Sequence, residues 1–190
     1  MGTISKDTFK RLFLLYTIGQ FKKGVYGRLR LNKVIYFAIK DARKIPFTFR
    51  HDHYGQHSKD LDDINEHLLS MKYTTAIPLE SGQGNRYALT SKDHMEFYGI
   101  AMSCIDSRLK EKVDKVVQDL GYESEVDLKK KAYMDPRFLE SEEGDVLFEE
   151  NLKERINVDL PDDDCEDLEL SLDPKFISAM THLSDWKGRQ

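Results

Sequence analysis

The chain has 190 residues, of which 39% are apolar, 33% charged and 11% aromatic. This length suffices to bury a hydrophobic core, and the aromatic share argues against a wholly disordered chain. No apolar run approaches the roughly 18 to 20 residues of a membrane-spanning helix, and the N-terminus lacks a secretory h-region. The two cysteines, Cys104 and Cys165, form no CxxC motif and suit a reducing compartment. We therefore expect a cytoplasmic protein.

The net charge of −5 conceals a strong asymmetry along the chain. Residues 1–60 carry 13 basic and 4 acidic side chains (+9), residues 61–139 carry 11 and 14 (−3), and residues 140–190 carry 5 and 16 (−11). A basic first third can serve an anionic partner such as nucleic acid. An acidic last third can cover that surface, mimic nucleic acid or keep the chain in solution.

Three amphipathic helices are predicted in the first third. Apolar residues at helical spacing mark one helix over residues 7–20 and a second over residues 28–42. Pro46 then excludes helix, and the aromatic run 47–49 indicates a short strand. Ser58 is a favourable N-cap for a third helix, whose acidic first turn suits the helix dipole.

Two strand-like runs, residues 73–79 and 86–90, flank a glycine-rich segment and predict a β-hairpin. Three helices closed by a hairpin is the winged-helix arrangement. We therefore predict an α+β, mostly helical fold with a winged-helix-like domain at residues 1–90, a long helix at 91–120 and an acidic α/β extension at 121–190.

The long helix carries apolar residues at steps of three and four from Tyr98 to Leu120 and ends at Gly121, a plausible C-cap. This seam suits either packing against the domain or a homodimer through residues 98–120. In the extension, Ser124 resembles the N-cap of a short helix, residues 146–156 read as helical, and residues 168–172 alternate like a strand. Residues 173–183 read as a short amphipathic helix.

No convincing catalytic or metal site emerges. His51, His53 and His57 with Asp60 have the residue types of a zinc site, but the HxH pattern is common and no cysteine lies nearby. Cys104 lies on the apolar seam and is expected to act as a small hydrophobe. We therefore expect a protein without enzyme activity, bound metal or cofactor.

Three short motifs resemble the winged-helix core of Panacea-type antitoxin domains and related uncharacterised prokaryotic proteins. LNKVIYFA at residues 31–38 stands where that family has an L-x-K-L-x-Y-F-like helix. YGQHS at 54–58 stands where the family has Y-G-P-x-S before a helix, with Gln56 in place of the usual proline. GNRYALT at 84–90 is similar to the family's wing, which ends in Y-x-L-T. The resemblance implies a non-enzymatic interaction module of the kind found in toxin neutralisation.

A protein partner is expected in preference to DNA. In a winged helix the third helix reads the major groove, but here that helix carries Asp60, Asp62, Asp63 and Glu66, which would repel phosphates. We thus expect an antitoxin-like, protein-binding regulator of prokaryotic or phage type; the alternative is a DNA-binding winged-helix transcription regulator. The candidate partner- or nucleic-acid-binding residues are basic and histidine side chains: Lys22, Lys23, Arg28, Arg30, Lys33, Arg50, His51, His53, Lys59 and Arg86.

Overall fold

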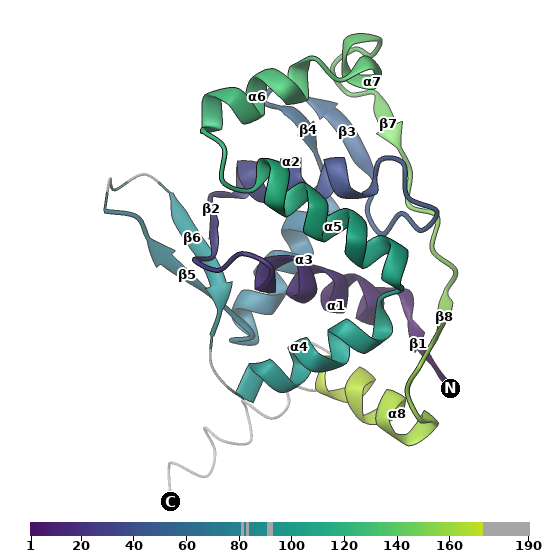
Figure 1. The fold of residues 1–190 in the computed structure, drawn as a ribbon. Coiled ribbons are helices and arrows are strands. Elements are labelled where there is room, and N and C mark those ends of the chain that lie inside the picture. Colours follow the sequence, from purple (N-terminus) through teal and green to yellow (C-terminus); the bar gives the residue numbers. More distant parts are fainter. Residues whose placement is uncertain (81, 83, 91–92, 173–190) are drawn as a thin grey trace, which may run out of the picture.

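The computed structural model describes residues 1–80, 82, 84–90 and 93–172, with residues 93–97 as backbone alone (Figure 1). These residues form an α+β fold of helices and small antiparallel sheets. The helices are α1 (Lys6–Gly19), α2 (Arg28–Ile39), α3 (Lys59–Ser70), α4 (Asp93–Cys104), α5 (Ser107–Leu120), α6 (Glu125–Tyr133), α7 (Pro136–Leu139) and α8 (Asp162–Ser171). The strands are β1 (Gly2–Ser5), β2 (Val25–Tyr26), β3 (Phe49–Asp52), β4 (Gly55–His57), β5 (Thr74–Pro78), β6 (Asn85–Leu89), β7 (Val146–Phe148) and β8 (Arg155–Val158).

Helix α1 forms the centre of the hydrophobic core. Ser5 caps it, since its Oγ accepts a hydrogen bond from the Thr8 amide at 3.2 Å. Every residue from Thr8 to Ile18 is buried, because α3 and α4 both pack against α1 and β1 and β6 also contact it. Helix α2 packs beside it against α5 and the β3–β4 hairpin. The first two predicted helices are therefore confirmed.

The predicted third helix and hairpin are also confirmed. Ser58 caps α3 by accepting a hydrogen bond from the Leu61 amide at 3.3 Å. Strands β5 and β6 pair antiparallel in a hairpin that projects from one side of the molecule (Figure 1). Strand β2, from the turn between α1 and α2, joins the outer side of β6 and gives the sheet order β2-β6-β5.

The prediction of one long helix over residues 91–120 is wrong. Two helices, α4 and α5, are separated at Ile105 and Asp106. The backbone of Asp106 is extended, and its carboxylate accepts a hydrogen bond from the Leu109 amide at 3.0 Å. An N-cap in the middle of an apolar seam starts a new helix, so the chain changes direction there.

The apolar seam lies inside the chain. Ile105, Leu109 and Val113 are each no more than 3% exposed, with α4 packed on α1 and α5 packed on α2. Tertiary packing therefore occupies much of the face that a homodimer through residues 98–120 would need, and self-association there stays a prediction.

The described part of the acidic extension, residues 121–172, folds onto the first part of the chain, with β7 and β8 along the right side of Figure 1. Strand β7 pairs with β3 to give the sheet order β4-β3-β7, and β8 pairs with β1. Residues 146–156 were expected to be helical, and this is wrong: they contribute to β7 and β8. Edge strands of the first part offer unpaired backbone groups, and pairing with them outweighs local helix propensity.

The strand expected at residues 168–172 is likewise wrong, because these residues lie in and directly after α8. Cys165, Leu168 and Leu172 are buried, at the three- and four-residue spacing of one helix face, while Leu170 is 52% exposed. In contrast, Ser124 does cap α6 as predicted, and Gly121 is the C-cap of α5. The helix predicted over residues 173–183 lies outside the described residues.

Among the described residues, no helix combines the length and the apolar character needed to cross a bilayer.

Candidate partner-binding surface

The β3–β4 hairpin, inserted between α2 and α3, carries Arg50 and His51 in β3 and His53 at its tip. Gly55 begins β4 with a left-handed φ of 90°. A Cβ atom at this position would lie 2.6 Å from Nζ of Lys33 and 2.9 Å from the Tyr133 ring. Glycine is therefore required by both the backbone angle and the close approach of α2 and α6.

Lys33 of α2 lies beneath this tip and is not a surface residue, which corrects the expectation that it belongs to an exposed basic patch. It is 1% exposed, and its Nζ donates hydrogen bonds to the carbonyls of Tyr54 (3.1 Å) and Gln56 (2.8 Å). Burial lowers the pKa of Lys33 to about 7, although the nearby Asp52 acts in the opposite direction. The lysine fixes the hairpin tip from below.

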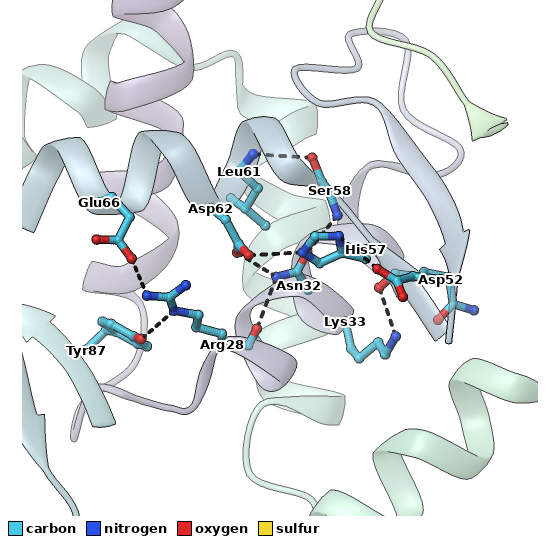
Figure 2. Close-up of polar contacts among 11 residues, drawn as sticks. Arg28, Asn32, Lys33, Asp52, His57, Ser58, Leu61, Asp62, Glu66 and Tyr87 are labelled. Carbon is cyan, nitrogen blue, oxygen red and sulfur yellow. Dashed lines mark hydrogen bonds and ion pairs between the residues drawn. The ribbon is translucent and has the colours of Figure 1, made fainter. Parts of the chain in front are cut away.

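A polar network joins the hairpin to the start of α3 (Figure 2). Asn32 donates through Nδ2 to the Asp62 carboxylate at 3.1 Å and accepts through Oδ1 from the Ser58 amide at 2.9 Å. His57 lies between two carboxylates, with Nε2 3.0 Å from Asp62 and Nδ1 3.4 Å from Asp52. These contacts hold the hairpin rigidly against α2 and α3.

Gln56, which replaces the proline of the resembling family, ties the hairpin to a further helix. Its side chain is 1% exposed, and Nε2 donates to the carbonyl of Ala132 in α6. A proline at this position has no side-chain donor and could not form this hydrogen bond.

Helices α6 and α7 cover the other side of the hairpin with aromatic side chains. The rings of Tyr133 and Phe138 stack at 5.3 Å between centroids, and the His51 ring lies 3.8 Å from Phe138. His51 Nδ1 also lies 2.8 Å from the Ser141 hydroxyl. His51 is therefore engaged inside the chain, under the surface that α6 and α7 form.

Large apolar and aromatic side chains remain exposed around this hairpin tip. Tyr54 is 68% exposed, Tyr133 36% and Met134 70%. His53 is exposed and packs edge-on against Tyr54, with ring centroids 4.9 Å apart. We call this group of side chains the tyrosine patch: His53, Tyr54, Tyr133, Met134 and Phe138. Residues of this kind, held on a rigid base, are typical of contact surfaces in protein complexes.

The basic surface expected on α2 does not exist as a free patch. Arg28 pairs with Glu66 and donates from Nε to the Tyr87 hydroxyl at 3.1 Å (Figure 2). Arg30 donates to the carbonyl of Gly121 at 2.8 Å, and burial lowers its pKa. Together with the burial of Lys33, these contacts commit the cations of α2 to the fold.

The remaining predicted residues fall into two groups. Arg50, His51 and Lys59 help to line a cavity of about 480 Å³ between the hairpin, α3 and the segment 143–144. Lys22, Lys23 and Arg86 border a different cavity, of about 310 Å³, between the α1–β2 turn and β6. The sequence prediction missed Tyr133 and Met134 entirely, because nothing in the sequence shows that α6 lies beside the hairpin.

Metal binding and cysteine chemistry can be checked for the described residues. No group of three or more His, Cys, Asp or Glu side chains among them could hold a metal ion. The three imidazoles of residues 51–57 contact different neighbours and do not converge. Cys104 and Cys165 are buried, and burial raises both thiol pKa values, that of Cys104 to about 12. A protonated, buried thiol is a poor nucleophile.

Comparison with known proteins adds no relative. No family model, curated protein sequence or solved structure matches the chain.

Proposed function

We propose that this chain is a non-enzymatic, antitoxin-like module that binds a protein partner through the tyrosine patch. The carrying observation is the exposure of Tyr54, Tyr133 and Met134 around one rigid hairpin. Aromatic and methionine side chains are enriched at protein interfaces because they bury much area at little entropic cost. The hairpin is fixed by Lys33, so little conformational entropy remains to be lost on binding.

We also propose that residues 1–90 form a winged-helix-like unit. Two features support this: the element order α1, β2, α2, α3, β5, β6, and the pairing of β2 with the outer side of the β5–β6 hairpin. The β3–β4 hairpin is then an insertion before the third helix.

The proposed kinship with Panacea-type domains has its own support, since the first two resembling motifs contact each other and the third lies against the start of the same helix. Lys33 bonds to the carbonyls of Tyr54 and Gln56, and Arg28, just before the first motif, bonds to Tyr87 in the third.

Duplex DNA recognition by α3 is the weaker alternative. The exposed side chains of this helix include Asp63 and Glu66, and Glu66 is paired with Arg28. Carboxylates at the reading position would repel the phosphates that supply most of the affinity for DNA. Reversing the charges of Arg28, Arg30 and Lys33 is no clean test of DNA binding, since all three stabilise the fold.

The proposal is tested by capturing partners from nuclease-treated lysate of the native host with three full-length baits. The patch variant is Tyr54→Ala with Met134→Ala. The matched control is Met102→Ala with Leu170→Ala, which truncates side chains that are 43% and 52% exposed and lie outside the patch. We expect a defined protein on the wild type and the control, reduced at least about tenfold on the patch variant, which corresponds to about 1.4 kcal/mol.

Equal melting temperatures for the three baits would establish that they are equally folded. If the patch variant retains the protein as well as the control does, the tyrosine patch is not the binding surface. If no protein is retained and a specific duplex is recovered without nuclease, the protein-binding function is wrong and the regulator function takes its place.

A further inference from the structure

A second surface, separate from the tyrosine patch, carries cations that form no ion pair with the described residues. Lys22 and Lys23 are exposed in the turn between α1 and β2, and Arg86 of β6 faces the same cavity of about 310 Å³. No carboxylate is among the residues that line this cavity. Within the described residues, none of the three cations forms an ion pair. This contrasts with α2, whose cations are held by the fold.

The turn brings the backbone as well as the side chains to this surface. Gly24 has a left-handed φ of 78°, and a Cβ there would lie 2.6 Å from the Tyr87 carbonyl and 3.1 Å from Cγ of Arg86. The turn therefore lies directly on β6, which keeps the two lysines close to Arg86. Three positive charges, without an ion pair among the described residues, thus border one concave surface.

Exposed aromatic rings flank these cations on both sides. Tyr26 of β2, 42% exposed, pairs with Arg86 across the sheet, and the guanidinium carbon lies 6.0 Å from the ring centroid. Tyr122, in the turn between α5 and α6, is 55% exposed, and its hydroxyl accepts a hydrogen bond from the Lys22 amide at 3.1 Å. An exposed tyrosine therefore lies beside Arg86 and another beside Lys22.

We propose that this surface binds a single strand of nucleic acid. Lysine and arginine side chains neutralise successive phosphates, and exposed aromatic rings stack on unpaired bases, which is the combination that single-strand-binding proteins use. A duplex keeps its bases paired and offers nothing to the tyrosines. The site differs from the tyrosine patch in residues and in ligand, so it stands or falls independently of the proposed function.

The probes are fluorescein-labelled 20-nucleotide strands of mixed sequence, one of DNA and one of RNA, and the corresponding DNA duplex. Binding of the full chain is followed by fluorescence anisotropy at increasing salt. Three neutralised phosphates predict a slope of log K against log salt of about −2, so that tripling the salt weakens binding about tenfold. The DNA and RNA arms identify the preferred strand, and either supports the proposal if the duplex binds more weakly.

The charge test compares two double variants of equal charge change. Lys22→Glu with Lys23→Glu should weaken single-strand binding at least about tenfold, since it replaces attraction by repulsion at two phosphates. Lys115→Glu with Lys153→Glu, at exposed positions outside this surface, should change it less than about twofold, because distant exposed charges are screened. The milder variant Lys22→Gln with Lys23→Gln removes the two charges without reversing them. It should also weaken single-strand binding, by less than the double glutamate variant does.

The stacking test uses Tyr26→Ala, for which we expect about a fivefold loss or more if a base stacks there. Each variant's melting temperature, taken from circular dichroism, establishes that it is folded. Three results would overturn the proposal: no binding of either strand at low salt, equal losses in the two charge-reversed variants, or a duplex bound as tightly as the single strands.

Discussion

The hydroxyl of Tyr36 donates a hydrogen bond to the carboxylate of Asp135 at 2.8 Å, although the two residues lie 99 positions apart. Lys40 pairs with the same carboxylate, and Asp135 also caps α7 by accepting from the Arg137 amide at 3.1 Å. Burial alone would raise the pKa of Asp135, but the bonds from Lys40 and Tyr36 outweigh it and hold the pKa below its usual value. One carboxylate thus joins α2 to the helices that carry the tyrosine patch.

Replacing this carboxylate should be costly. Asp135→Ala leaves the fully buried Tyr36 hydroxyl without its acceptor and removes the α7 cap, so we expect a loss of about 3 kcal/mol in the free energy of unfolding. Tyr36→Phe should cost about 1 kcal/mol, and a double-mutant cycle in urea measures the coupling between the two. The exposed Asp127→Ala serves as control. Equal losses for Asp135→Ala and Asp127→Ala would contradict this role.

Lys33 predicts a specific pH dependence of stability. Its pKa is about 7 in the folded chain and about 10.4 when unfolded, so between these values the unfolded chain binds more protons and stability rises with pH. From about pH 7 to 8.5 Lys33 contributes a gain of about 1.6 kcal/mol, and the titration of unfolded cysteines in this range is common to the wild type and the lysine variants. Lys33→Met should remove this rise, whereas Lys115→Met should keep it. If the free energy of unfolding of the wild type and of Lys33→Met changes with pH in the same way, the pKa of Lys33 is not lowered by burial.

The ion pair between Lys10 and Glu150 links the acidic extension to α1. The Lys10 side chain is 7% exposed, and its second carboxylate, on Asp60, lies at 3.7 Å. Glu150→Gln should therefore destabilise the protein by about 2 kcal/mol, because a buried ammonium loses its nearest partner. Glu154→Gln, whose side chain is 82% exposed, should cost less than about 0.5 kcal/mol. Urea unfolding measures the stability of both variants. A larger loss for Glu154→Gln than for Glu150→Gln would contradict the role of the Lys10–Glu150 pair.

The apolar seam of α5 should contribute to folding and not to self-association. Leu109→Ala should lower the free energy of unfolding by about 3 kcal/mol, since Leu109 is 3% exposed and packed in the core. Met102→Ala, at a 43% exposed position, should change it little. Light scattering of the wild type should give a mass near 22.2 kDa at high concentration. A mass of twice that value for the wild type, together with a monomeric but folded Leu109→Ala variant, would support the homodimer instead.

Several elements could be predicted from the sequence because local interactions determine them. The stripes of α1, α2 and α3, the caps at Ser58 and Ser124, and the glycine-bounded β5–β6 hairpin each depend on residues a few positions apart. The third helix could even be recognised as acidic, and so as poorly suited to read DNA, from its composition alone.

Tertiary structure decided the rest, because the deciding partners lie far away in the chain. Strands β7 and β8 exist because β3 and β1 offer them edges, which local propensity does not encode. The same is true of Lys33: a lysine on an amphipathic helix reads as a surface cation until the hairpin carbonyls of Tyr54 and Gln56 cover it. Only the packing of α6 beside that hairpin brings Tyr133, and with it the following Met134, to the hairpin tip. The sequence by itself thus determined the local elements and the charge asymmetry, while long-range packing decided which side chains stay exposed.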